Sequence, residues 1–105
     1  MYMKSREALD LYARAYAQTP NLRRGIRLAL NGNAADILLV IHRGLGRGQT
    51  GQVIDHILKR GGGHNVLTQA RDQLLAFHHF EDWDVRIDCE NTAYLIAAAL
   101  DVDWQ

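Results

Sequence analysis

The chain has little of what marks a secreted or membrane protein. It contains one cysteine, Cys89, so neither an internal disulfide nor a multi-cysteine zinc site can form. Its longest run of large aliphatic residues, Ile37–Ile41, has five residues, and no apolar run of any composition exceeds eight, whereas a membrane-spanning helix needs about 20. The charged residues that follow Met1 do not lead into the apolar stretch of a secretion signal. We therefore expect a cytoplasmic protein with no membrane partner.

Motifs for nucleotide chemistry are also scarce. Residues 46–51, GRGQTG, match the glycine pattern of dinucleotide-binding turns. That turn must follow a strand, however, and the apolar run before it begins with helix-capping residues, which indicates a helix. Gln52 stands where a phosphate-binding lysine would be required. The motif therefore predicts a helix connection more strongly than a nucleotide site.

The histidines and the cysteine lack the spacing of a metal or catalytic site. No two histidines are four residues apart, as in H-x-x-x-H, and two adjacent histidines on a helix point about 100° apart. Cys89 falls on an apolar helical face, which is typical of a core residue. We expect no metal, no cofactor and no enzymatic activity, with a small metal or redox protein built on His78, His79 and Cys89 as an alternative. The histidines are His42, His56, His64, His78 and His79.

Apolar residues recur with helical spacing along the whole chain, and no segment alternates strictly for long. The sequence predicts an all-α fold, a single domain over residues 1–105 with five or six short helices around a central apolar helix at about residues 34–43. The other helices are expected at about residues 6–18, 20–31, 50–60, 66–80 and 89–100. Residues 44–49 would form a glycine-rich loop and residues 81–87 an extended connector. The expected N-caps are Ser5, Thr19, Asn33, Thr50, Asn65 and Asp88.

Each expected helix has an apolar stripe that should face the core. In the central helix the apolar residues occupy nearly every side, which predicts full burial. The other stripes consist of Leu9, Tyr12, Ala13 and Tyr16; Leu22, Ile26, Ala29 and Leu30; Val53, Ile54, Ile57 and Leu58; Leu67, Ala70, Leu74, Phe77 and His78; and Cys89, Ala93, Ile96 and Leu100.

Charge is segregated along the chain, although the net charge is zero. Residues 1–60 hold ten Lys/Arg and four acids, a balance of +6, and residues 61–105 hold two arginines and eight acids, a balance of −6. Such asymmetry indicates charged partners. A basic patch of Arg23, Arg24, Arg27 and Arg47 would suit phosphates, so a small helical nucleic-acid-binding regulator is one reading. A solvated arginine face, or one paired with the acidic end of the same domain, is another.

The acidic half gathers carboxylates around an aromatic residue. Trp83 lies among them, and an aromatic anchor within a charged surface is a common composition for an interaction hot spot. The alternative is that Trp83 packs into the core and that the acids stabilise a helix N-terminus. The candidate partner-binding residues are Glu81, Asp82, Trp83, Asp84, Asp88 and Glu90.

One stretch of the chain carries a family resemblance. Ser5–Leu39, SREALDLYARAYAQTPNLRRGIRLALNGNAADILL, resembles the small phage-encoded anti-CRISPR proteins, over about a third of the chain and by general character. The resemblance implies a non-enzymatic inhibitor that binds a type I CRISPR surveillance complex in the host cytoplasm and blocks recognition of target DNA. We therefore expect a protein or nucleoprotein complex as partner, bound through the acidic residues around Trp83, with direct nucleic-acid binding as the alternative.

Overall fold

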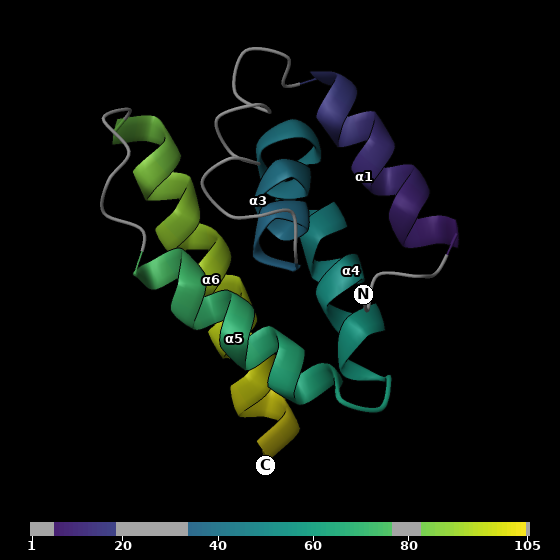
Figure 1. The fold of residues 1–105 in the computed structure, drawn as a ribbon, viewed down its shortest axis with the longest axis vertical. Coiled ribbons are helices and arrows are strands. Elements are labelled where there is room, and N and C mark those ends of the chain that lie inside the picture. Colours follow the sequence, from purple (N-terminus) through teal and green to yellow (C-terminus); the bar gives the residue numbers. More distant parts are fainter. Residues whose placement is uncertain (1–5, 19–33, 77–82, 105) are drawn as a thin grey trace.

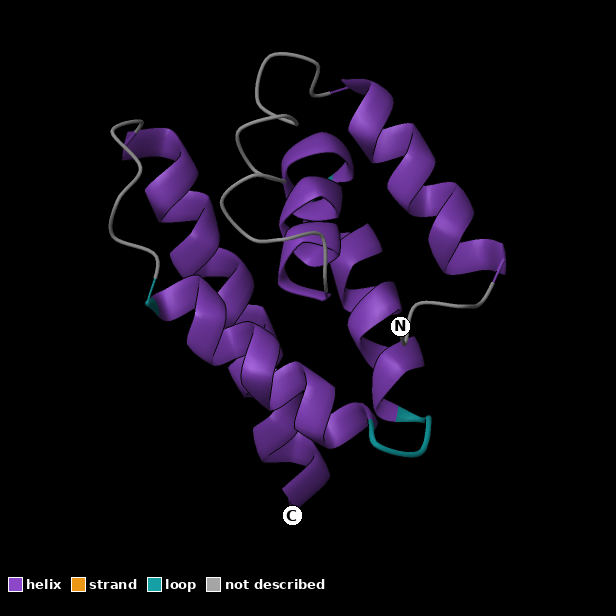
Figure 2. Ribbon diagram, viewed as in Figure 1, coloured by secondary structure: helices purple, strands orange, loops and turns teal. Residues whose placement is uncertain are grey.

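The computed structural model describes residues 6–18, 34–76 and 83–104, and all regular structure in these residues is helical (Figures 1 and 2). The predicted all-α class is confirmed. The predicted helix at residues 20–31, with its apolar stripe, lies outside the described residues. The described helices are α1 (Arg6–Gln18), α3 (Ala34–Leu45), α4 (Arg47–Leu58), α5 (Gly63–Leu75) and α6 (Trp83–Trp104).

Helix α3 is the centre of the core, as its sequence predicts. Every residue from Ala35 to Ile41 is buried, and α3 contacts α1, α4, α5 and α6. A helix that is apolar on nearly every side is stable only when neighbouring helices enclose it. The core also receives Val53, Ile54 and Ile57 of α4 and Leu67, Ala70 and Leu74 of α5, all at most 2% exposed.

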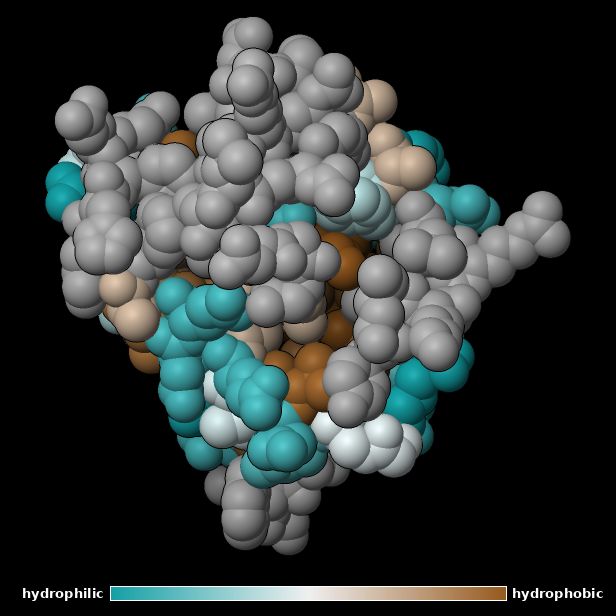
Figure 3. All heavy atoms as spheres, viewed as in Figure 1, coloured by the Kyte–Doolittle hydropathy of each residue, from teal (hydrophilic) through white to brown (hydrophobic). Residues whose placement is uncertain are grey.

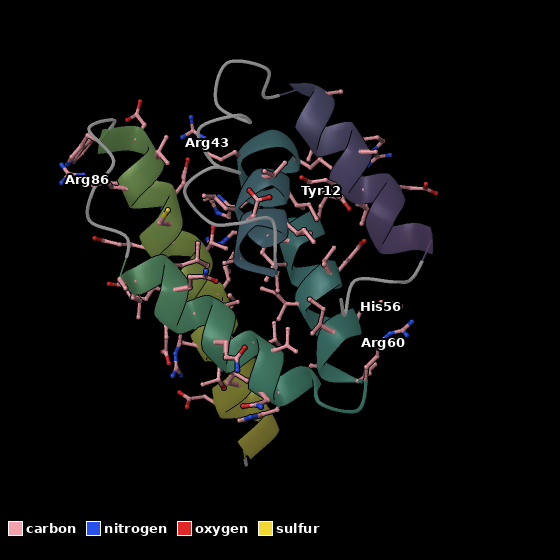
Figure 4. The ribbon with its side chains drawn as sticks, viewed as in Figure 1. Tyr12, Arg43, His56, Arg60 and Arg86 are labelled. Carbon is pink, nitrogen blue, oxygen red and sulfur yellow. The ribbon has the colours of Figure 1, made fainter. Side chains whose placement is uncertain are left out.

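Helix α1 has the predicted bounds but is rotated from the predicted stripe. Leu11 and Ala15 are buried, Tyr12 is half-buried against the core on the side facing α3, and Ala13 is exposed (Figure 4). The rotation brings Ala15 onto α3 at Gly44, where an added Cβ would lie 2.7 Å from the Ala15 carbonyl oxygen. A glycine inside α3 therefore permits the close approach of the two helices.

The predicted glycine-rich loop at residues 44–49 is wrong. Helix α3 continues to Leu45 and α4 begins at Arg47, so that Gly46 alone separates them, with a positive φ of 90°. Thr50, predicted as an N-cap, lies inside α4, where it is fully buried and its hydroxyl donates a hydrogen bond of 2.9 Å to the Gly46 carbonyl. The GRGQTG motif is thus a junction between two helices and does not follow a strand.

The boundaries of α5 also differ from the prediction. Asn65 was expected as its N-cap, but α5 begins at Gly63, and Gly62 precedes it in the left-handed conformation without a side-chain cap. The helix ends at Leu75, before the expected residue 80, and residues 77–82 lie outside the described part. On the face shown in Figure 3, hydrophilic side chains follow α5, and apolar atoms lie beside them toward the middle of the molecule.

Helix α6 is much longer than predicted. It begins at Trp83 and ends at Trp104, so Trp83–Ile87 are helical instead of extended, and Asp88 is an interior residue instead of an N-cap. The predicted inward face is confirmed, because Cys89, Ala93, Ile96 and Leu100 are at most 3% exposed. Helix α6 packs against α5, α3 and α4 (Figure 1). None of the described helices is long and apolar enough to span a membrane.

Candidate protein-binding surface

The side of α6 that points away from the core has its own regular spacing. We call this set the outer stripe: Trp83, Ile87, Glu90, Tyr94, Ala97 and Asp101. Its members are separated by four, three, four, three and four residues, so at 100° per residue they lie within about 40° of one line along the helix. The buried residues of α6, including Val85, Thr92 and Ile96, lie on the opposite side.

The outer stripe exposes two aromatic rings. The side chain of Trp83 is 63% exposed and that of Tyr94 is 60% exposed, while Ile87 and Ala97 between them are half-buried. Trp83 therefore does not pack into the core, which was the alternative at the level of sequence. Exposed tryptophan and tyrosine on one rigid helix face are typical of protein-binding surfaces, because each buries a large area on contact at little conformational cost.

The charges on α6 are almost all negative. The helix contains one arginine, Arg86, and five carboxylates: Asp84, Asp88, Glu90, Asp101 and Asp103. Two of these acids are in the last turn, where no basic residue accompanies them. The C-terminal end of a helix dipole is itself negative, so cations are favoured there and carboxylates are not. Of these acids, Glu90 and Asp101 belong to the outer stripe, which has no basic member, so its own charge favours a cationic partner.

Of the predicted partner-binding residues, the structure describes four. Trp83, Asp84 and Glu90 are exposed, whereas Asp88 is turned toward α3, and Glu81 and Asp82 lie outside the described residues. The sequence reasoning missed Ile87, Tyr94 and Asp101. A signal for them exists, since counting helical spacing from Trp83 finds all three, but the assumption of an extended segment at residues 81–87 hid it.

Asp88 joins the two charged halves of the chain inside the molecule. Its carboxylate forms an ion pair with Arg43 at the end of α3, and both side chains are about four-fifths buried, at 21% and 19% exposure. Thr92 donates a hydrogen bond of 2.6 Å to the Asp88 carbonyl. Pairing between the basic and acidic ends of the domain thus takes place at this position, where it fixes α6 to the central helix. Figure 4 shows Arg43 near one end of α3 and Arg86 on α6.

Two titratable groups beside this ion pair are perturbed by burial. The pKa of His42 is lowered from its ordinary value of 6.5, chiefly because burial disfavours the imidazolium, although Asp88 opposes the shift from 3.8 Å. Burial also raises the pKa of the Cys89 thiol to about 11, and the carboxylate of Asp88 adds to the effect. At neutral pH both groups are therefore uncharged. A buried, protonated thiol is a packing group and a poor nucleophile.

The structure describes only one residue of the predicted basic patch, so the patch stays a prediction. Arg47 is exposed at the start of α4, and Arg23, Arg24 and Arg27 lie outside the described residues. On the other end of α4, Arg60 and His56 approach each other at 3.4 Å on the exposed side (Figure 4). Among residues 6–18, 34–76 and 83–104 there is no group of three or more His, Cys, Asp or Glu side chains that could hold a metal ion.

Comparison with known proteins adds no relative. No family model matches the chain, and neither a curated protein nor a solved structure is significantly similar to it. The class of the protein is therefore defined by its own geometry: an all-α domain that exposes an acidic and aromatic helix face.

Proposed function

We propose that this domain is a non-enzymatic inhibitor that binds a protein or nucleoprotein complex through the outer stripe of α6. The observation that carries the proposal is the exposure of Trp83 and Tyr94 on a helix whose opposite side is anchored in the core. A rigid scaffold reduces the entropy lost on binding, and the carboxylates beside the rings would steer the domain toward basic protein surface. Basic surface of this kind is what nucleoprotein machines present to nucleic acid.

The first partner to test is a type I CRISPR surveillance complex, because of the resemblance of Ser5–Leu39 to anti-CRISPR proteins. The domain would lie on basic protein surface that otherwise receives target DNA. The measurement is binding of target duplex to the purified surveillance complex with and without the domain. We expect the domain to reduce DNA binding, and expect no binding of the domain to the duplex alone.

Two single substitutions assign the effect to the outer stripe. Trp83→Ala removes an exposed ring and Glu90→Lys reverses an exposed charge, and each should weaken binding to the complex by about tenfold or more. The matched controls are Leu75→Ala, which removes another exposed apolar side chain, and Asp10→Lys, which reverses an exposed charge on α1. All four variants should melt like the parent protein. If the test variants bind as tightly as the control variants, the outer stripe does not take part in binding.

A further inference from the structure

The outer stripe of α6 has the spacing of a helix-pairing seam. Gaps of four, three, four, three and four residues are the heptad spacing with which one helix packs along another. From Trp83 to Asp101 the stripe runs for about 27 Å at 1.5 Å per residue. Its half-buried small residue, Ala97, would let a second helix approach closely, while Trp83 and Tyr94 would flank that helix with aromatic surface.

Charge decides which helix fits this seam. Glu90 and Asp101 are exposed within it, and no member of the stripe is basic. A second copy of α6 would bring another excess of carboxylates to the contact, which disfavours self-pairing. Lysine or arginine on the incoming helix would instead meet these two acids, and near Asp101 it would also meet the negative end of the α6 dipole. Complementary flanking charge is how paired helices select partners.

We infer that the outer stripe binds a basic amphipathic α-helix of its partner, with an apolar face against Trp83, Ile87 and Tyr94 and with flanking lysines or arginines against Glu90 and Asp101. The inference rests on the proposed function and names the element that the domain recognises. It is helix-to-helix docking, in which a few apolar anchors supply affinity and the charges supply selectivity.

Synthetic peptides test the inference without knowledge of the natural partner. The first peptide is a stapled helix of 22 residues, the length of α6, with leucines along one seam and lysines flanking that seam. The second has the same composition with the lysines moved to the far face. The third carries glutamate in place of the flanking lysines. Binding is followed by Trp83 fluorescence in a Trp104→Phe background and by anisotropy of labelled peptide.

We expect the first peptide to bind at least about tenfold more tightly than its isomer or the glutamate peptide, with a blue shift of Trp83 emission. The double variant Glu90→Lys with Asp101→Lys should reverse the preference in favour of the glutamate peptide. A variant with Asp10→Lys and Asp55→Lys, which changes the net charge equally at exposed positions outside the stripe, should keep the original preference.

Equal binding of the two lysine isomers would overturn the inference, because it would show attraction by charge alone. Failure of all peptides to bind at about 100 μM, which means a binding free energy weaker than about −5.5 kcal/mol, would overturn it as well. A dimer of the domain in sedimentation that Trp83→Ala dissociates would assign the seam to a second copy. If the peptides fail while Trp83→Ala still weakens binding to the surveillance complex by about tenfold or more, the proposed function stands and only the helical partner is excluded.

Discussion

Three successive glycines join α4 to α5, two in the turn and one as the first residue of α5, and each is required to a different degree. Gly61 has no positive φ, and an added Cβ there would meet no atom within 4 Å. Gly62 has a φ of 80°, in the left-handed region. At Gly63 an added Cβ would lie 1.9 Å from the carbonyl oxygen of Ile57, which is main chain and cannot rotate aside. We predict that three single Gly→Ala substitutions separate these constraints.

The magnitudes follow from the three environments. Gly61→Ala should be neutral or should stabilise the fold by up to about 1 kcal/mol, because alanine restricts the unfolded chain and meets nothing in the folded one. Gly62→Ala should cost about 1–2 kcal/mol, the strain of a left-handed residue with a Cβ. Gly63→Ala must move the last turn of α4 away from the start of α5, and overpacking of this kind costs about 3 kcal/mol or more.

The assay is guanidinium unfolding followed by circular dichroism at 222 nm, with the thermal midpoint as a second measurement. A change of about 1 kcal/mol shifts the midpoint of a domain of this size by roughly 4 °C, so the three variants are resolvable. The expected order of destabilisation is Gly63 above Gly62 above Gly61. A Gly63→Ala protein as stable as the Gly61→Ala protein would refute the close packing of α4 against α5 at this turn.

Three further predictions concern the cluster around the Arg43–Asp88 ion pair. Because the pKa of His42 is lowered on folding, the unfolded chain binds a proton near pH 6.5 that the folded chain does not, so stability falls as the pH drops below about 6.5. Between pH 7.5 and pH 5.5, the free energy of unfolding should fall less for His42→Gln than for the parent protein. Asp88→Asn should cost about 1–3 kcal/mol because Arg43 loses its carboxylate, whereas Asp72→Asn, in an exposed pair, should cost below about 0.5 kcal/mol; equal costs would contradict the structure. Cys89, with a pKa of about 11, should react with Ellman's reagent at pH 8 only in denaturant, and fast labelling of the folded protein would contradict its burial.

The all-helical class and the core residues could be predicted from the sequence because both follow from the spacing of apolar residues. The run from Ile37 to Ile41 leaves no polar side for a surface helix, and the structure buries all of it. The inward residues of α6, such as Ala93 and Ile96, were found in the same way. Burial of an amphipathic face supplies most of the stability of a helix, so its signal is strong even in a single sequence.

Helix boundaries were less predictable because polar residues have two local roles. Thr50, Asn65 and Asp88 were expected to cap helices, and all three lie inside them. A threonine inside a helix can donate its hydroxyl to the carbonyl four residues earlier, and Thr50, Thr68 and Thr92 all do so. Glycine was misleading as well, since Gly44 lies inside α3, where the absence of a Cβ makes room for Ala15 of α1. Tertiary contacts outweighed local propensity at both kinds of residue.

The candidate surface depended on one of these boundaries. With α6 beginning near residue 89, Trp83 belongs to a connector and has no geometric relation to Tyr94. Once the helix begins at Trp83, the two rings are eleven residues apart, about three turns, and fall on one line with Glu90. The same boundary turns Asp88 inward to Arg43. The charge asymmetry of the sequence therefore has two roles among the described residues of α6: Asp88 holds α6 to the core, whereas Glu90 and Asp101 accompany the aromatic rings on the outer stripe.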